Sequence, residues 1–63
     1  MAKWFTVRRH STRPRWFVDT HIGNTYTARG EHPYRSLRSA KRAAKRLAAI
    51  SGWGWGVGKR EGD

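Results

Sequence analysis

Apolar and polar residues alternate along the first part of the chain, and this alternation predicts β-strands. Residues 3–10 and 15–22 are rich in aromatic and β-branched types, which favour strands, and residues 25–29 predict a shorter third strand. The glycine and asparagine at 23–24 fit a two-residue hairpin turn, because both tolerate positive φ. The pattern therefore predicts three consecutive strands joined by turns.

A helical period replaces the alternation at Leu37. From there to Ile50 the chain contains no glycine, proline or acidic residue, and Ser36 is a suitable N-cap. The apolar positions that share one side of this helix are Leu37, Ala40, Ala43, Ala44, Leu47 and Ala48. The predicted fold is α+β: a three-stranded antiparallel sheet packed against one C-terminal α-helix (βββα), followed by a Gly/Trp-rich tail.

The two faces of the predicted sheet differ in chemistry. Side chains alternate between the faces of a sheet, and a single helix covers only one of them. The residues expected on the covered face are Phe5, Val7, Trp16, Val18, Ile22, Tyr26 and Ala28. The residues expected on the open face are Trp4, Thr6, Arg8, His10, Arg15, Phe17, Asp19, His21, Thr25, Thr27 and Arg29. It is therefore a basic, hydroxylated and aromatic surface.

Length and composition narrow the function classes. A chain of 63 residues has room for one small core and no second domain, and without cysteine it has neither disulfides nor a thiolate zinc site. No apolar segment approaches the roughly 20 residues that span a membrane, and the N-terminus does not resemble a signal peptide. We expect a cytoplasmic protein, in a bacterial cell or associated with its nucleoid.

The charge is strongly positive and unevenly distributed. The chain has 14 Lys and Arg against 4 Asp and Glu, a net charge of +10. All of this excess lies in residues 1–50, which we take as a basic domain, whereas the tail at 51–63 is neutral. A polyanion is the expected partner of such a chain.

Two groups of cations are the candidate nucleic-acid contacts. One group follows the polar side of the predicted helix and consists of Arg38, Lys41, Arg42, Lys45 and Arg46. No acid lies between Pro33 and Lys59, so no neighbouring carboxylate relieves the repulsion within this group. The other group lies on the strands and their connections and consists of Arg8, Arg9, Arg13, Arg15, Arg29 and Arg35. The open-face rings of Trp4 and Phe17 also suit stacking on single-stranded bases.

The tail leaves three alternatives open for Trp53 and Trp55. They pack back over the open face or the edge of the sheet, they contact a second copy or another protein, or they belong to a disordered segment. A tail that covers the sheet would leave the helix as the surface for nucleic acid.

The sequence gives no support for catalysis. The three histidines, at 10, 21 and 32, have no spacing typical of a metal site, and no cysteine assists them. Asp19 and His21 have no evident nucleophile as a partner. We expect no enzyme, no metal, no cofactor and no small-molecule substrate.

The order and residues of the chain resemble two groups of small DNA-binding domains. The matching residues are Trp4 and Val7 to Arg9, then 15–18 (Arg-Trp-Phe-Val), then the pattern Tyr34-x-Ser36-x-x-x-Ala40-x-x-x-Ala44. These residues resemble the plant ethylene-response-factor domain and the arm-binding domain of phage integrases, over about residues 3–49. The resemblance implies a sheet that enters the DNA major groove, backed by a helix. The more basic helix of this chain suggests instead that DNA meets the helix.

These observations lead to one main hypothesis and two alternatives. The main hypothesis is a small double-stranded-DNA-binding protein, bacterial or phage, architectural or regulatory, that binds mainly through phosphate contacts. The first alternative is a phage-type modulator that docks on an acidic host protein through Trp53 and Trp55. The second alternative is association with RNA or the ribosome, which the same positive charge would favour.

Overall fold

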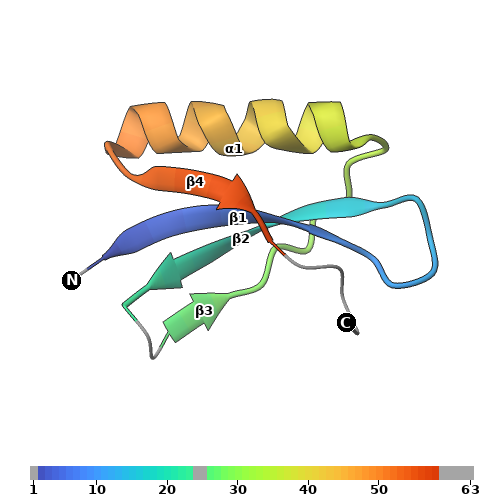
Figure 1. The fold of residues 1–63 in the computed structure, drawn as a ribbon, viewed down its shortest axis with the longest axis horizontal. Helices are drawn as coiled ribbons and strands as arrows, with labels where there is room; N and C mark the ends of the chain where they lie inside the picture. The colour runs from blue at the N-terminus through green and yellow to red at the C-terminus, as the bar shows by residue number, and fades with distance from the viewer. Residues whose placement is uncertain (1, 24–25, 59–63) are drawn as a thin grey trace.

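A four-stranded sheet with one helix across it forms the protein (Figure 1). The computed structural model describes residues 2–23 and 26–58. The elements are β1 (Lys3–Arg9), β2 (Trp16–Ile22), β3 (Tyr26–Ala28), α1 (Leu37–Ser51) and β4 (Gly54–Val57). The order in the sheet is β3-β2-β1-β4. β2 runs antiparallel to β1 and to β3, whereas β4 runs parallel to β1.

The α+β class is confirmed, but a three-stranded antiparallel sheet was the wrong prediction. The sheet is four-stranded and mixed, because a segment of the predicted tail adds β4 beside β1. The three predicted strands are present with slightly shorter bounds. At the predicted hairpin turn Gly23 has φ 62°, while Asn24 lies outside the described residues.

The predicted faces of β1 and β2 are confirmed for four of the residues expected beneath the helix: Phe5, Val7, Trp16 and Val18. Val7 lies opposite Val18, and Phe5 and Val7 are buried beneath the helix. Trp16 and Val18 of β2 pack against the same cluster. These apolar residues share one face because they alternate with the residues of the open face at the period of a strand.

α1 begins and ends at residues with clear capping geometry. The Ser36 hydroxyl accepts a hydrogen bond from the backbone N–H of Ser39, which satisfies one of the free donors of the first turn. At the other end Gly52 adopts a left-handed conformation, φ 72°, and its N–H bonds to the Ala48 carbonyl. This turn sends the chain back along the sheet.

The helix approaches the sheet through alanine. Ala40 and Ala44 are completely buried and Ala48 nearly so, all against Phe5 and Val7. A methyl group is the smallest side chain that still excludes water, so the helix backbone can lie close above two larger strand residues. The spacing of four residues keeps these methyl groups on one side of α1, and the cations therefore lie elsewhere.

The two tryptophans of the predicted tail have different surroundings. After the Gly52 turn, Trp53 packs against the core, with its ring stacked on Phe5 at 5.2 Å between centroids. Trp55 belongs to β4, pairs with Phe5 across the parallel ladder and remains 40% exposed. Of the three alternatives for the tail, packing at the edge of the sheet is the one observed.

We predict that Trp53 is part of the stabilising core. The Trp53→Ala variant should lower the free energy of unfolding by about 2–3 kcal/mol, because it removes a large ring that is packed on Phe5. Urea denaturation followed by circular dichroism measures the loss. Trp55→Ala is the matched control and should cost about 1 kcal/mol, since its ring is more exposed. Equal losses for the two variants would contradict this account of the core.

Candidate nucleic-acid interface

The outer side of α1 carries five exposed cations. α1 lies on one face of the sheet (Figure 1). Its alanine side packs into the core, so the opposite side of the helix is turned away from the sheet. The exposed cations on this side are Arg38, Lys41, Arg42, Lys45 and Arg46. We call them the helix cations. The structure brings all five together on one surface, as the helical period predicted.

No carboxylate offsets the helix cations within the described residues. Only two acids, Asp19 and Glu31, occur in that part of the chain. Asp19 is buried in an ion pair with Arg8. Successive helix cations at a spacing of four, such as Arg38 and Arg42, therefore repel each other without relief. Each such like-charged pair destabilises a helix by about 0.2–0.5 kcal/mol.

A hollow of about 430 Å³ lies along one flank of the helix. Its lining residues are Tyr34, Ser39, Arg42, Ala43, Arg46 and Leu47. The lining thus combines two guanidinium groups with alanine and leucine side chains, a phenol and a hydroxyl. Guanidinium groups suit phosphate oxygens because their N–H donors match them in pairs. The hollow extends the cationic surface from the outer side of α1 toward Tyr34.

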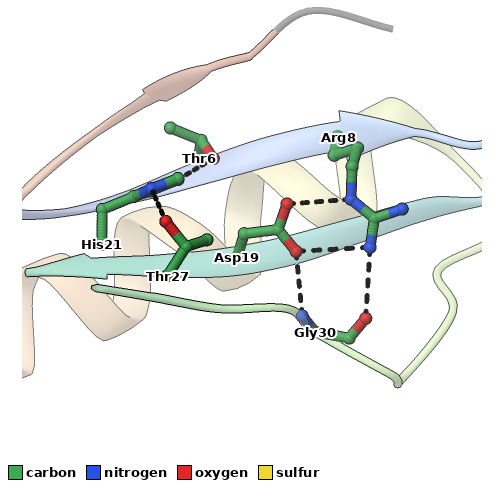
Figure 2. A network of polar contacts seen from close by, with 6 residues as sticks. All are labelled: Thr6, Arg8, Asp19, His21, Thr27 and Gly30. Atoms are coloured by element: carbon green, nitrogen blue, oxygen red, sulfur yellow. Dashed lines mark hydrogen bonds and ion pairs between the residues drawn. The ribbon is translucent and has the colours of Figure 1, made fainter. Parts of the chain in front are cut away.

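On the opposite face of the sheet, the cation Arg8 is already bound (Figure 2). Arg8 Nε donates to Asp19 Oδ2 at 2.8 Å, and Arg8 Nη2 donates to Asp19 Oδ1 and to the Gly30 carbonyl, both at 3.3 Å. The Gly30 N–H donates to Asp19 Oδ1 at 2.9 Å. The guanidinium also lies over the Phe17 ring, 4.6 Å from its centroid. Both groups of this ion pair are therefore satisfied inside the molecule.

Gly30 is required where it stands in this network. A Cβ at that position would come within 2.1 Å of the Val18 carbonyl oxygen, so a side chain there would displace the loop. The close approach brings the backbone of Gly30 into reach of Asp19. The loop after β3 thus closes over the carboxylate and completes its burial.

His21, at the other end of the open face, also has partners inside the molecule. His21 Nε2 lies 2.7 Å from the Thr6 hydroxyl, and His21 Nδ1 lies 3.1 Å from the Thr27 hydroxyl (Figure 2). The imidazole stacks on Trp4 at 5.1 Å, with the ring planes 12° apart. One face of the Trp4 ring, which was a candidate for base stacking, is thus covered by His21.

The predicted arginine group of the strands does not form a single surface. Arg8 is bound on the open face, whereas Arg9 lies over Trp16, a residue of the helix-side face, and donates to the His10 carbonyl at 3.0 Å. The remaining four are exposed at separate places: Arg13 and Arg15 between β1 and β2, Arg29 after β3, and Arg35 just before α1. The connection between β1 and β2 lies at the same end of the molecule as the start of α1 (Figure 1).

Two parts of this arrangement were missed by sequence reasoning. The hollow with Tyr34 depends on how the loop before α1 docks, through paired backbone bonds with Trp16 of 2.8 and 3.0 Å. The second missed feature is the ion pair between Arg8 and Asp19, which the sequence could have predicted. In the hairpin register Arg8 faces Phe17, so Asp19 is its diagonal neighbour on the same face.

Two further features of the described residues concern metal ions and membranes. They contain no group of three or more His, Cys, Asp or Glu placed to hold a metal ion. Among them, no helix has the length and apolar character needed to cross a lipid bilayer.

The chain was compared with protein-family models, with curated proteins and with solved structures, and none matches it. The resemblance to the plant ethylene-response-factor domain and to the integrase arm-binding domain therefore stays a prediction.

We predict that the ion pair of the open face stabilises the fold. Asp19→Asn should lower the free energy of unfolding by about 3 kcal/mol, because it leaves the Arg8 guanidinium without its counter-charge. Chemical denaturation measures the difference. Glu31→Gln is the matched control: it removes the same charge from an exposed position and should change stability by less than about 0.5 kcal/mol. Identical stabilities of the two variants would contradict the role assigned to the pair.

Proposed function

We propose that this protein binds double-stranded DNA, mainly through phosphate contacts, and that the outer side of α1 is the binding surface. The observation that carries the proposal is the set of five helix cations, all exposed and none paired with an acid in the described part of the chain. A polyanion removes the repulsion among them and gains their attraction. An architectural or regulatory role in a bacterial or phage setting fits this mode of binding.

The dimensions of the cationic surface suit a duplex. Arg38 and Arg46 are eight residues apart, which corresponds to about 12 Å along a helix. The major groove of B-form DNA is also about 12 Å wide, so cations along α1 reach phosphates on both of its sides. Both guanidinium and ammonium groups are present, and ammonium groups carry charge without a fixed bonding geometry. We therefore expect contacts that depend weakly on base sequence.

The hollow beside α1 supports the same choice of surface. Arg42 and Arg46 belong both to the helix cations and to the lining of the hollow. A phosphate at this flank would meet two guanidinium forks, with the Tyr34 and Ser39 side chains near by. The cationic surface is thus concave at this flank of α1.

The open face is a poorer candidate for the duplex. Recruiting Arg8 to a phosphate would cost its bonds to Asp19 and Gly30, and it would leave a buried carboxylate without its partner. The proposal therefore differs from the sheet-mediated binding that the family resemblance implies. DNA remains the proposed partner, but α1 and not the sheet is the proposed binding surface.

A protein-binding role through both tail tryptophans receives less support. Trp53 is packed on Phe5 and is not available as an anchor without loss of core contacts. Trp55 keeps 40% of its surface exposed and is the tail ring open to contact.

Removal of helix cations should weaken DNA binding more than removal of the same charge elsewhere. At 0.1 M salt, Arg38→Gln/Arg42→Gln should weaken binding to a random duplex roughly 50-fold, since two phosphate contacts are lost. Fluorescence anisotropy at several salt concentrations measures both affinity and salt dependence. The wild-type slope of log K against log salt should be about −4 to −5, and the variant should lose about 2 of it.

The matched control is Arg13→Gln/Arg15→Gln, which also removes two exposed positive charges. If the two double variants lose affinity equally, the surface is not confined to α1. If the wild type fails to bind a duplex even at low salt, the proposed function is wrong.

Duplex RNA distinguishes the RNA alternative. The major groove of A-form RNA is deep and narrow, so a helix does not enter it. Unlabelled duplex DNA should therefore compete for the protein better than duplex RNA of the same length. Stronger competition by the RNA would favour the alternative.

A further inference from the structure

The outer edge of the short strand β4 is neutral within the described residues. Gly54–Val57 contains no charged residue and no proline, and neither does the described stretch from Gly52 to Gly58 around it. Exposed edges normally carry lysine, proline or a bulge, because unpaired backbone groups recruit further strands. A chain with a net charge of +10 thus presents a neutral edge at this place.

The backbone groups of the free edge can be assigned. In a parallel ladder the N–H and C=O of one residue point to the same side, and successive residues alternate. The Gly58 N–H donates to the Val7 carbonyl at 2.8 Å, so Gly54 and Gly56 also face β1. Trp55 and Val57 therefore direct their N–H and C=O groups outward. The free edge offers two donors and two acceptors.

The side chains of β4 also lie on one side only. The register pairs Trp55 with Phe5 and Val57 with Val7, so both side chains stand on the helix side of the sheet. They are 40% and 57% exposed. The other face of β4 carries only glycine, which presents no side chain to an approaching strand. The edge is thus apolar on one face and bare on the other.

We propose that a second copy of this chain pairs with β4 in antiparallel orientation, about a two-fold axis at Gly56. In this register Trp55 lies opposite Val57 of the second copy, and Val57 lies opposite its Trp55. These are the residues whose backbone groups point outward, so each of the two pairs exchanges two hydrogen bonds. All four outward groups are satisfied.

Complementarity of the edge with itself favours a second copy over another partner. The large ring of Trp55 meets the smaller Val57, and aromatic and β-branched residues stabilise each other in opposed positions. Glycines meet glycines on the opposite face without steric conflict. An acidic partner would gain no charge attraction from this neutral edge, whereas the helix cations would attract it. The same neutrality lets two highly charged copies approach here.

The arrangement has a consequence for the cationic surface. A two-fold axis perpendicular to the sheet keeps both α1 helices on one face of the continuous eight-stranded sheet. The helix cations of both copies then point to the same side. The dimer does not require DNA, and its test is independent of the proposed function.

Sedimentation of the DNA-free protein tests the interface. The wild type should associate to a dimer, more tightly at 0.5 M than at 0.05 M salt, because salt screens the repulsion between like-charged copies. Val57→Lys, which places a charge on the edge, should raise the dissociation constant at least about tenfold. Ile50→Lys is the matched control: it changes an exposed apolar residue, 76% accessible, on the helix, and should leave the dimer unchanged.

A symmetric disulfide tests the register. The chain has no cysteine of its own, and a Cβ added at Gly56 meets no atom within 4 Å. Directly opposed residues of a non-hydrogen-bonded pair have Cα atoms about 4.5 Å apart, within the range that a disulfide spans. Gly56→Cys should therefore form a covalent dimer on mild oxidation, and Ala49→Cys, exposed on α1, should remain largely monomeric.

Three results would overturn the proposal. A wild type that stays monomeric at about 1 mM in 0.5 M salt excludes a dimer of useful affinity. A dimer that Val57→Lys leaves intact uses another surface. A dimer in which Gly56→Cys cross-links no better than Ala49→Cys has a different register. If Val57→Lys abolishes the dimer and still binds DNA, the dimer proposal is supported, and DNA binding does not depend on the dimer.

Discussion

The close contact between the alanine side of α1 and the two buried residues of β1 is the constraint on which the rest of the structure depends. Ala40 and Ala44 have no exposed surface, and Phe5 and Val7 fill the space beneath them. A helix held in this way has only one side left for its cations. The same close approach gives Trp53 a place on Phe5 once Gly52 has turned the chain. The packing of α1 on β1 therefore determines the core, the position of the charged surface and the place of the fourth strand.

The charges of the protein are divided by this architecture into two sets with different chemistry. On the open face, Arg8 is held by Asp19, and the Gly30 loop closes over the pair, so this cation serves the fold. On the outer side of α1, no acidic residue of the described chain pairs with the cations. Their mutual repulsion destabilises the helix, and an anionic partner would relieve it. A net charge of +10 identifies a class of partner, whereas the pairing of individual charges indicates which surface is available.

Local patterns were sufficient to predict part of the fold and not the rest. The helix and the faces of β1 and β2 follow from periods of 3.6 and 2 residues, which can be recognised from residues close together in the sequence. β4 was not predicted because glycine alternates with Trp55 and Val57, a pattern without strand propensity on one of its faces. Its pairing with β1 joins residues about fifty positions apart and exists only after α1 has folded back. In the candidate site, the helical period alone accounts for the exposure of the helix cations, whereas the surroundings of Arg8 and Arg9 depend on partners that the period does not reveal.

Backbone amide chemical shifts, recorded while a short DNA duplex is added to isotope-labelled protein, show which surface of the protein meets the DNA. The account predicts the largest, salt-sensitive shifts along residues 38–46 of α1 and at the adjoining Tyr34. It also predicts that Thr6, Asp19 and His21 on the open face keep their positions. Shifts concentrated on the open face, with α1 unchanged, would contradict the claim that the helix is the surface for nucleic acid.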